Sequence, residues 1–259
     1  MISLSISNNV AEVVLDAPDK LNSLDEQALA DLAQAYDDAA VAASRGEVRA
    51  LLLRGEGRAF CAGRDISNVS PESDDAAAYL GVLVQPLLKK MSSFPAPTFA
   101  AAQGACLGVG LGLLLATDVV YVAENAKFGS PFAKLGATLD SGGHWYFTER
   151  LGMHRTLDLI YTAELMSGAE AVARGMFSRA LPAEELLETT RGIVASVAVG
   201  ATGAFKASKD LVARIRDQRL GLWEAMEEEN AEQARLCKTE DYAEGFKAFQ
   251  EKRAPQFKG

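Results

Sequence analysis

Two glycine-bearing turns constrain this chain more than any other feature of its sequence. The first, Phe60–Asp65, reads FCAGRD, and the second, Gln103–Gly112, reads QGACLGVGLG about forty residues later. Each turn ends a hydrophobic run. Backbone N–H groups at two such turns can point at one carbonyl oxygen and form an oxyanion hole without side chains.

The glycines of the second turn have two other interpretations. Gly108, Gly110 and Gly112 can be close-packing glycines of a buried helix. A dinucleotide-binding fingerprint fits less well, because the GxGxG pattern lacks the spacing of the third glycine. The oxyanion hole and the buried helix therefore both stay open.

The two turns, with three further segments in the same order, resemble the crotonase (enoyl-CoA hydratase/isomerase) superfamily. The further segments are DKLNSL (19–24), AKFGSP (126–131) and EGFKAFQEKR (244–253). The resemblance covers nearly the whole chain and implies an α/β crotonase (ClpP/crotonase-like) fold of stacked ββα units with a C-terminal helical subdomain. It further implies a spiral core over 1–195 and a helical trimerisation subdomain over 196–259, with a homotrimer or hexamer as the assembly.

Composition excludes several classes of protein. The 259 residues are 49% hydrophobic and carry a net charge of −9, which argues against a nucleic-acid surface. An anion such as coenzyme A can still bind at a local basic patch, for which the candidates are Lys20, Arg54, Arg58, Lys252 and Arg253. Three cysteines form no paired framework or metal-ligand spacing, so we expect a cytoplasmic protein without a metal.

The uncharged stretch Thr98–Thr117 is long enough to span a bilayer. Its four glycines, its Gln103 and the preceding prolines favour a buried strand, turn and helix instead. We therefore expect no membrane segment.

The first 140 residues alternate short strands and helices. The expected strands are Val10–Leu15, Val48–Arg54, Thr98–Ala102 and Asp118–Ala123. A helix is expected over Leu24–Ser44, with a capping box formed by Ser23 and Glu26. The polar segment Ser67–Asp75 resembles the mobile lid of the family.

After Gly143 we expect helices and no strands. Ser167 and Glu170 predict a second capping box, and Gly175 suits the end of that helix. The expected helices are Trp145–Leu151, Thr156–Ala163, Ala169–Arg174, Ala183–Val199, Gly203–Arg216, Leu220–Cys237 and Asp241–Lys252.

By resemblance, the oxyanion donors are the backbone N–H groups of Arg64 and Val109. Val109 departs from the glycine that the family usually has, and its β-branched side chain narrows the backbone geometry. The resemblance implies substrate contacts from both turns and their surroundings at Ala62, Gly63, Asp65, Ile66, Gly108 and Phe132.

The two catalytic glutamates of the hydratase branch align with Gly112 and Phe132, and neither residue can move a proton. A two-glutamate hydratase is therefore disfavoured. Asp140, in LDSGGHW (139–145), matches an aspartate of other branches of the family, and this local sequence is most similar to that of phenylacetate-type isomerases. Asp140 can instead be only the N-cap of the following helix.

Other candidate residues have structural alternatives. His144 can assist Asp140 or simply pack on its helix, and Asp65 can satisfy local amides in its turn. The resemblance implies that Lys20, Phe249 and Lys252 bind coenzyme A, the last two from a neighbouring subunit. Their alternatives are a core contact for Phe249 and a solvated helix face for Lys252.

These residues predict an enoyl-CoA isomerase that shifts a double bond through a thioester enolate, with Asp140 as acid and base. One carboxylate suffices, because it can remove a proton at one carbon and return it at another. No cofactor is needed beyond the coenzyme A of the substrate. The alternatives are a hydratase, lyase or hydrolase with a non-standard residue set, and a non-catalytic acyl-CoA-binding protein.

Overall fold

The computed structural model describes residues 1–67 and 69–259. The strands are β1 (Ile2–Ser7), β2 (Val10–Leu15), β3 (Ala50–Gly55), β4 (Thr98–Ala102), β5 (Ala105–Leu107), β6 (Val119–Ala123), β7 (Lys127–Gly129), β8 (Met166–Ser167) and β9 (Arg179–Leu181). The α-helices are α1 (Glu26–Ser44), α2 (Ala76–Ala78), α3 (Gln85–Ser92), α4 (Val109–Leu115), α5 (Gly143–Thr162), α6 (Gly168–Ala173), α7 (Ala183–Ala198), α8 (Thr202–Gln218), α9 (Leu222–Leu236) and α10 (Glu240–Glu251). Tighter or wider helical turns are η1 (Pro18–Lys20), η2 (Tyr79–Val84), which is a π-helix, and η3 (Pro131–Leu135).

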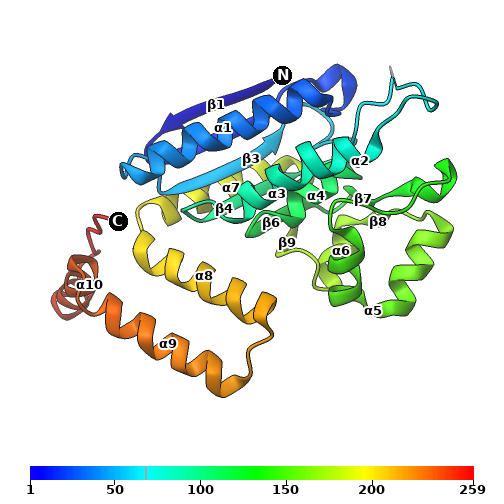
Figure 1. Ribbon diagram of the computed structural model, residues 1–259. Helices are drawn as coiled ribbons and strands as arrows, with labels where there is room; N and C mark the ends of the chain where they lie inside the picture. The colour runs from blue at the N-terminus through cyan, green and yellow to red at the C-terminus, as the bar shows by residue number, and fades with distance from the viewer. Residues whose placement is uncertain (68) are drawn as a thin grey trace.

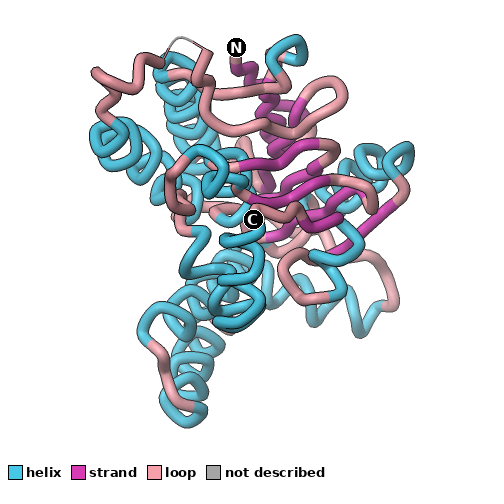
Figure 2. Tube along the Cα trace, turned by 90° about the vertical axis from the view of Figure 1, so that its right-hand side faces the viewer, coloured by secondary structure: helices cyan, strands magenta, loops and turns pink. Residues whose placement is uncertain are grey.

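Two sheets form the centre of the protein. The larger has the order β1-β2-β3-β4-β6-β9 and is parallel except for the β1–β2 hairpin, and the smaller has the order β5-β7-β8. Long apolar runs such as Leu51–Leu53 are fully buried, as expected of a parallel strand covered on both faces. In Figure 1, α1 passes in front of the sheet and α7 lies behind it. Figure 2 shows the strands stacked through the middle, with helices and loops forming the lower end.

The four expected strands are present. β2 and β4 have the expected bounds, and β3 and β6 begin two residues and one residue later than expected. The sequence analysis missed β1. The signal for its hairpin is the pair Asn8-Asn9, because asparagine tolerates the positive φ that a two-residue turn requires and that both residues adopt. The expectation of no strand after Gly143 is wrong, because β8 and β9 lie there. They have two and three residues, too few to give a periodic signal.

The residue that caps α1 is not the expected one, whereas the expected residue caps α6. The N-cap of α1 is Asp25, which accepts a hydrogen bond from the Ala28 amide at 2.8 Å, so the Ser23 capping box is wrong. The reason is that Leu24 is still extended, with its amide bonded to the Gly63 carbonyl. At α6 the cap is Ser167, as expected, and it accepts from the Glu170 amide at 3.1 Å. Gly175 follows that helix with φ of +75°.

The helices expected after residue 143 are all present. The two expected over 145–163 are the halves of α5, which kinks at Gly152. The expected division at 195/196 falls inside α7, and the two-part organisation stays a prediction. The stretch Thr98–Thr117 contains β4, β5 and α4, which confirms the expected buried strand, turn and helix. The alternative of a single membrane-spanning helix is wrong. Within the described residues, no helix combines the length and apolar character that a bilayer crossing needs.

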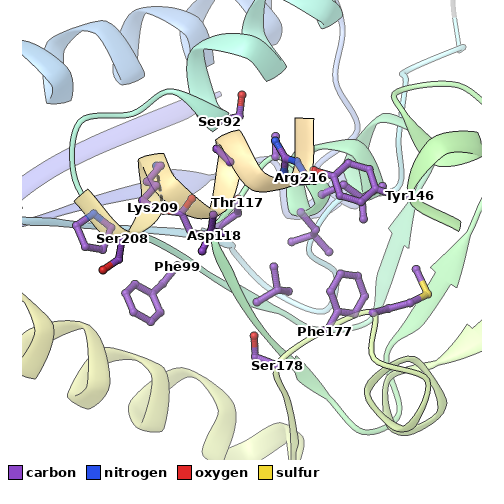
Figure 3. A pocket seen from close by; sticks show the side chains of 18 of the residues that line it. Ser92, Phe99, Thr117, Asp118, Tyr146, Phe177, Ser178, Ser208, Lys209 and Arg216 are labelled. Atoms are coloured by element: carbon purple, nitrogen blue, oxygen red, sulfur yellow. Dashed lines mark ion pairs between the residues drawn. The ribbon is translucent and has the colours of Figure 1, made fainter. Parts of the chain in front are cut away.

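Polar side chains tie the C-terminal helices to the sheet. The buried Arg49 donates to the Thr202 hydroxyl at 2.9 Å and to the Phe257 carbonyl at 3.1 Å. On α8, Lys209 forms an ion pair of 2.9 Å with Asp118, which directly precedes β6 (Figure 3). These contacts join α8 and the last residues to the sheet that carries the glycine turns.

Candidate active site

The two glycine turns lie side by side because their backbones pair like short parallel strands. The pairing centres on a bridge between Cys61 and Cys106. The Cys61 amide donates to the Ala105 carbonyl, and the Leu107 amide donates to the Cys61 carbonyl, both at 3.0 Å. Both thiols are buried, and burial raises their pKa values. They are therefore structural groups rather than thiolate nucleophiles.

The glycines allow this approach. A Cβ atom on Gly63 would lie 2.9 Å from the Leu107 carbonyl oxygen, and one on Gly110 would lie 2.5 Å from the Cys61 carbonyl oxygen. Gly108 has φ of +52° and is the N-cap residue of α4. Gly110 and Gly112 do lie in a buried helix, as the alternative interpretation held, whereas Gly108 forms the turn before it.

The backbone N–H groups of Arg64 and Val109 have no hydrogen-bond acceptor within the described residues. On either side of Arg64, the Gly63 carbonyl accepts a hydrogen bond from the Leu24 amide, and the Asp65 amide donates to the Leu24 carbonyl. The Arg64 amide, which lies between these two groups, therefore faces away from Leu24. Val109 is the first residue of α4, where an amide lacks an intrahelical partner. Both N–H groups can therefore donate to a ligand oxygen.

Asp140 lies in the loop that precedes α5 and is half-buried. Its Oδ1 atom accepts a hydrogen bond of 2.8 Å from the Ser141 hydroxyl. The helix begins at Gly143, its N-cap residue is Gly142, and no side chain caps it. The interpretation of Asp140 as only an N-cap is therefore wrong, and its carboxylate remains available for chemistry.

The surroundings of Asp140 raise its pKa above the ordinary value of 3.8. Burial is the dominant cause. The Ser141 hydroxyl and the charges of Arg64 and His144 oppose this effect by favouring the ionised carboxylate. An acid poised between these influences can accept and return a proton more readily than an exposed aspartate.

The side chain of Arg64 is held beside the site. It forms two contacts with Asp74, at 2.6 and 3.0 Å, and its guanidinium lies 4.1 Å from the ring centroid of Tyr79. The Tyr79 hydroxyl donates to the Leu24 carbonyl at 3.1 Å. Sequence reasoning missed Asp74 and Tyr79 as partners of this turn, because neither belongs to a recognisable motif. Asn68, within the segment expected to be a lid, lies outside the described residues.

Gly112 and Phe132, the positions aligned with the two hydratase glutamates, pack against the site. A Cβ atom on Gly112 would lie 2.5 Å from the Cβ atom of Ser141. A Cβ atom on Gly108 would lie 3.0 Å from the end of the Phe132 ring. Thus Gly112 leaves room for the Asp140 loop, and Phe132 adds an apolar wall beside the second turn.

Asp65 satisfies local donors, as its alternative interpretation held. Its Oδ1 accepts from the Ser67 hydroxyl and amide, and its Oδ2 pairs with Lys20 at 3.0 Å. These contacts, those of Ser67 first, lower the pKa of Asp65 to about 2. The neighbouring Ala62 amide is bonded to the Leu21 carbonyl, and Ile66 is exposed.

Phe249 and Lys252 lie at the end of α10, far from α4 in Figure 1. Phe249 is 84% exposed, so the alternative interpretation of Phe249 as a core residue is wrong. Lys252 is exposed too. One chain does not bring these residues to the glycine turns. His144 is exposed, and its Nε2 lies 3.3 Å from the Thr138 hydroxyl.

A cavity of about 430 Å³ adjoins the site, and we call it the side cavity. Gly112, Ser141 and Gly142 form its wall next to Asp140. A cavity of about 670 Å³ lies under α8 (Figure 3), and one of about 850 Å³ lies at α10. None of these three cavities is lined by Asp140, Arg64 or Val109, whereas Arg64, Asp74 and Tyr79 line a further cavity of about 460 Å³.

Comparison with known proteins agrees with this geometry. The profile of the family described as enoyl-CoA hydratase/isomerase matches residues 5–259. The chain is 34% identical to a protein of Rhodobacter capsulatus named "Probable enoyl-CoA hydratase", over 100% of this chain and 98% of the relative. It is 30% identical to 1,2-epoxyphenylacetyl-CoA isomerase of Escherichia coli, over 98% and 97%.

A solved structure gives the same result for the fold. The crystal structure of enoyl-CoA hydratase from Bacillus anthracis superposes with a TM-score of 0.89 at 27% identity and covers 100% of this chain and 99% of that chain. The expected fold is therefore confirmed. The chain belongs to the enoyl-CoA hydratase/isomerase, or crotonase, family of acyl-CoA-processing enzymes.

Proposed function

We propose that this enzyme is an enoyl-CoA isomerase in which Asp140 moves a proton between two carbons of the acyl group. The observation that carries the proposal is the half-buried Asp140 carboxylate, which caps no helix and lies on a loop packed against Gly112 of α4. The unpartnered amides of Arg64 and Val109 supply the donors for the thioester oxygen. Relatives that carry both hydratase and isomerase names leave the reaction open, so the residues decide our choice.

The reaction follows from the acidity of a carbon next to a thioester. The Asp140 carboxylate takes a proton from C2 of a 3-enoyl thioester, and the electron pair passes to the thioester oxygen as a dienolate. The two amides stabilise the oxygen, each contributing about 3 kcal/mol to lowering the barrier. Asp140 then returns the proton to C4, which gives the 2-enoyl product and regenerates the carboxylate.

A hydratase with a non-standard residue set is the second candidate. It is favoured by the hydratase name of the relative at 34% identity. Hydration needs one group to activate water and a second to manage the proton at the α-carbon. Gly112 and Phe132 provide neither group, which is why we rank hydration second. The same two residues, with the buried Val109 side chain, would suit a protein that binds acyl-CoA without turnover.

The assembly and the compartment are further proposals. We propose a homotrimer, or a hexamer of two trimers, in which α10 of one subunit brings Phe249 and Lys252 to the coenzyme A bound beside Lys20 of another. Large apolar side chains on the C-terminal helices favour a partner, since Trp223 is 72% exposed and Phe249 is 84% exposed. The cysteines are free, as suits a cytoplasmic protein. A monomer at micromolar concentration in sedimentation velocity would contradict the assembly.

Replacing Asp140 with Asn should abolish double-bond migration. The amide keeps the size of the carboxylate and cannot accept the proton, so we expect kcat to fall at least about 100-fold. NMR and mass spectrometry of products from 3-enoyl-CoA in deuterated water measure both migration and exchange. Asp210→Asn, at an exposed position on α8, is the matched control. Migration that persists in Asp140→Asn, or a hydrated product formed by it, would overturn the isomerase.

Replacing Ser141 with Ala should move the acid limb of the kcat/KM profile to higher pH. Asp140 must be ionised to take the proton, so activity rises as pH rises through its pKa. The Ser141 hydroxyl lowers that pKa, and its removal leaves the raising effect of burial less opposed. Rates across pH 4 to 8 measure the shift, with the exposed Ser196→Ala as control. A limb that stays in place or moves to lower pH would contradict this account of Asp140.

Replacing Val109 with Pro should remove one oxyanion donor while preserving α4. Proline has no N–H and is tolerated at the first residue of a helix, so we expect kcat to fall about 100-fold. Val109→Gly is the matched control: it keeps the amide and should keep activity, while its free energy of unfolding falls by about 3 kcal/mol. Circular dichroism and binding of a saturated acyl-CoA establish that each variant is folded. Unchanged kcat in folded Val109→Pro would exclude this amide from the oxyanion hole.

A further inference from the structure

The side cavity leads from the Asp140 loop to α8. Gly112, Ser141 and Gly142 line it at the loop, next to Tyr146, whose amide donates to the Gly142 carbonyl at 3.1 Å, and Arg216 lines it from α8. Leu80, Val84, Leu88 and Ala116 contribute apolar side chains to the lining. A volume of about 430 Å³ is within the usual range for small-ligand pockets. Because Ser141, which follows Asp140, lines this cavity, we take it as the candidate pocket for the acyl group of a thioester.

The charge of the cavity differs in sign from that of the chain. Lys89 and Arg216 line it, and its described lining contains no aspartate or glutamate. The chain as a whole has a net charge of −9, and although Asp217 pairs with Arg216 from outside the lining, the Lys89 ammonium has no ion-pair partner within the described residues. Such a cavity favours an anionic group on its ligand.

Hydrogen-bond donors remain available in the lining of the cavity. Asp217 holds Nε and one terminal nitrogen of Arg216, at 2.6 and 3.0 Å. Within the described residues, the other terminal nitrogen of Arg216, the Lys89 ammonium and the Tyr146 hydroxyl have no hydrogen-bond partner. Arg216 and Tyr146 also line the 670 Å³ cavity, where Figure 3 shows them beside one another. A guanidinium with an adjacent hydroxyl is well suited to bind a carboxylate.

We propose that the acyl group of the substrate ends in a carboxylate, which binds to Arg216, Lys89 and Tyr146 in the side cavity. The inference rests on the proposed function, because it takes the thioester to lie at the Arg64 and Val109 amides. The methylene groups of the acyl chain then lie against Leu80, Val84 and Leu88. The substrate class is thus the monothioester of an unsaturated dicarboxylic acid.

Binding of saturated thioesters tests the subsite separately from turnover. Isothermal titration of the full chain compares hexanoyl-CoA with adipoyl-CoA, and succinyl-, glutaryl- and suberyl-CoA vary the distance between thioester and carboxylate. We expect one dicarboxylic thioester to bind at least tenfold more tightly than the uncharged chain of equal length. Arg216→Met and, independently, Lys89→Met should reduce that preference, and Arg216→Lys should retain part of it. Lys206→Met, exposed on the same helix, is the control for lost charge.

Each result of the titration decides the matter. A preference lost in Arg216→Met or Lys89→Met and kept in Lys206→Met would establish the subsite. An equal or weaker affinity for every dicarboxylic thioester, or a preference that neither variant changes, would overturn it. Kinetics with 3-hexenoyl-CoA and with 3-hexenedioyl-CoA, in which C6 is a carboxylate, then test the reaction. Binding preference without double-bond migration would leave the subsite established and overturn the isomerase, whereas no binding of any thioester would overturn both.

Discussion

The backbone pairing of two turns at Cys61 and Cys106 is the constraint on which the candidate site depends. Two hydrogen bonds of 3.0 Å fix the register of the turns, and Gly63 and Gly110 let the chains approach where a Cβ atom would collide with backbone oxygen. In this arrangement the Arg64 and Val109 amides have no acceptor within the described residues. Because the donors are backbone groups, the fold itself positions them before any substrate binds.

The second requirement is a carboxylate whose ionisation is balanced rather than suppressed. Burial alone would raise the pKa of Asp140 further and so disfavour its ionised form. The Ser141 hydroxyl and the nearby Arg64 charge oppose that effect. In the proposed site Arg64 would therefore contribute twice, with its amide and with its guanidinium, which the ion pair with Asp74 holds near Tyr79. The electrostatics of the two parts of the site are thus coupled through one residue.

Most of the fold could be predicted from the sequence, and the detail of the site only in part. The buried strands and the C-terminal helices have strong periodic patterns, and the glycine turns carry a recognisable motif. The cap of α1 was misassigned to Ser23 because the bridge that keeps Leu24 extended depends on Gly63, which is distant in the sequence. The side cavity could not be predicted either. It depends on α8 returning to the Asp140 loop, which the ion pair between Lys209 and Asp118 helps to secure.

The close fit of Gly112 against Ser141 also restricts how this enzyme can diverge. Any side chain at position 112 would begin with its Cβ atom 2.5 Å from that of Ser141. A glutamate could be accommodated there only after the loop that carries Asp140 had moved. Asp140, the base that we propose, would therefore be displaced by the same change. A change toward a two-glutamate enzyme therefore requires a shift of this loop together with the substitution at position 112, because of one steric overlap.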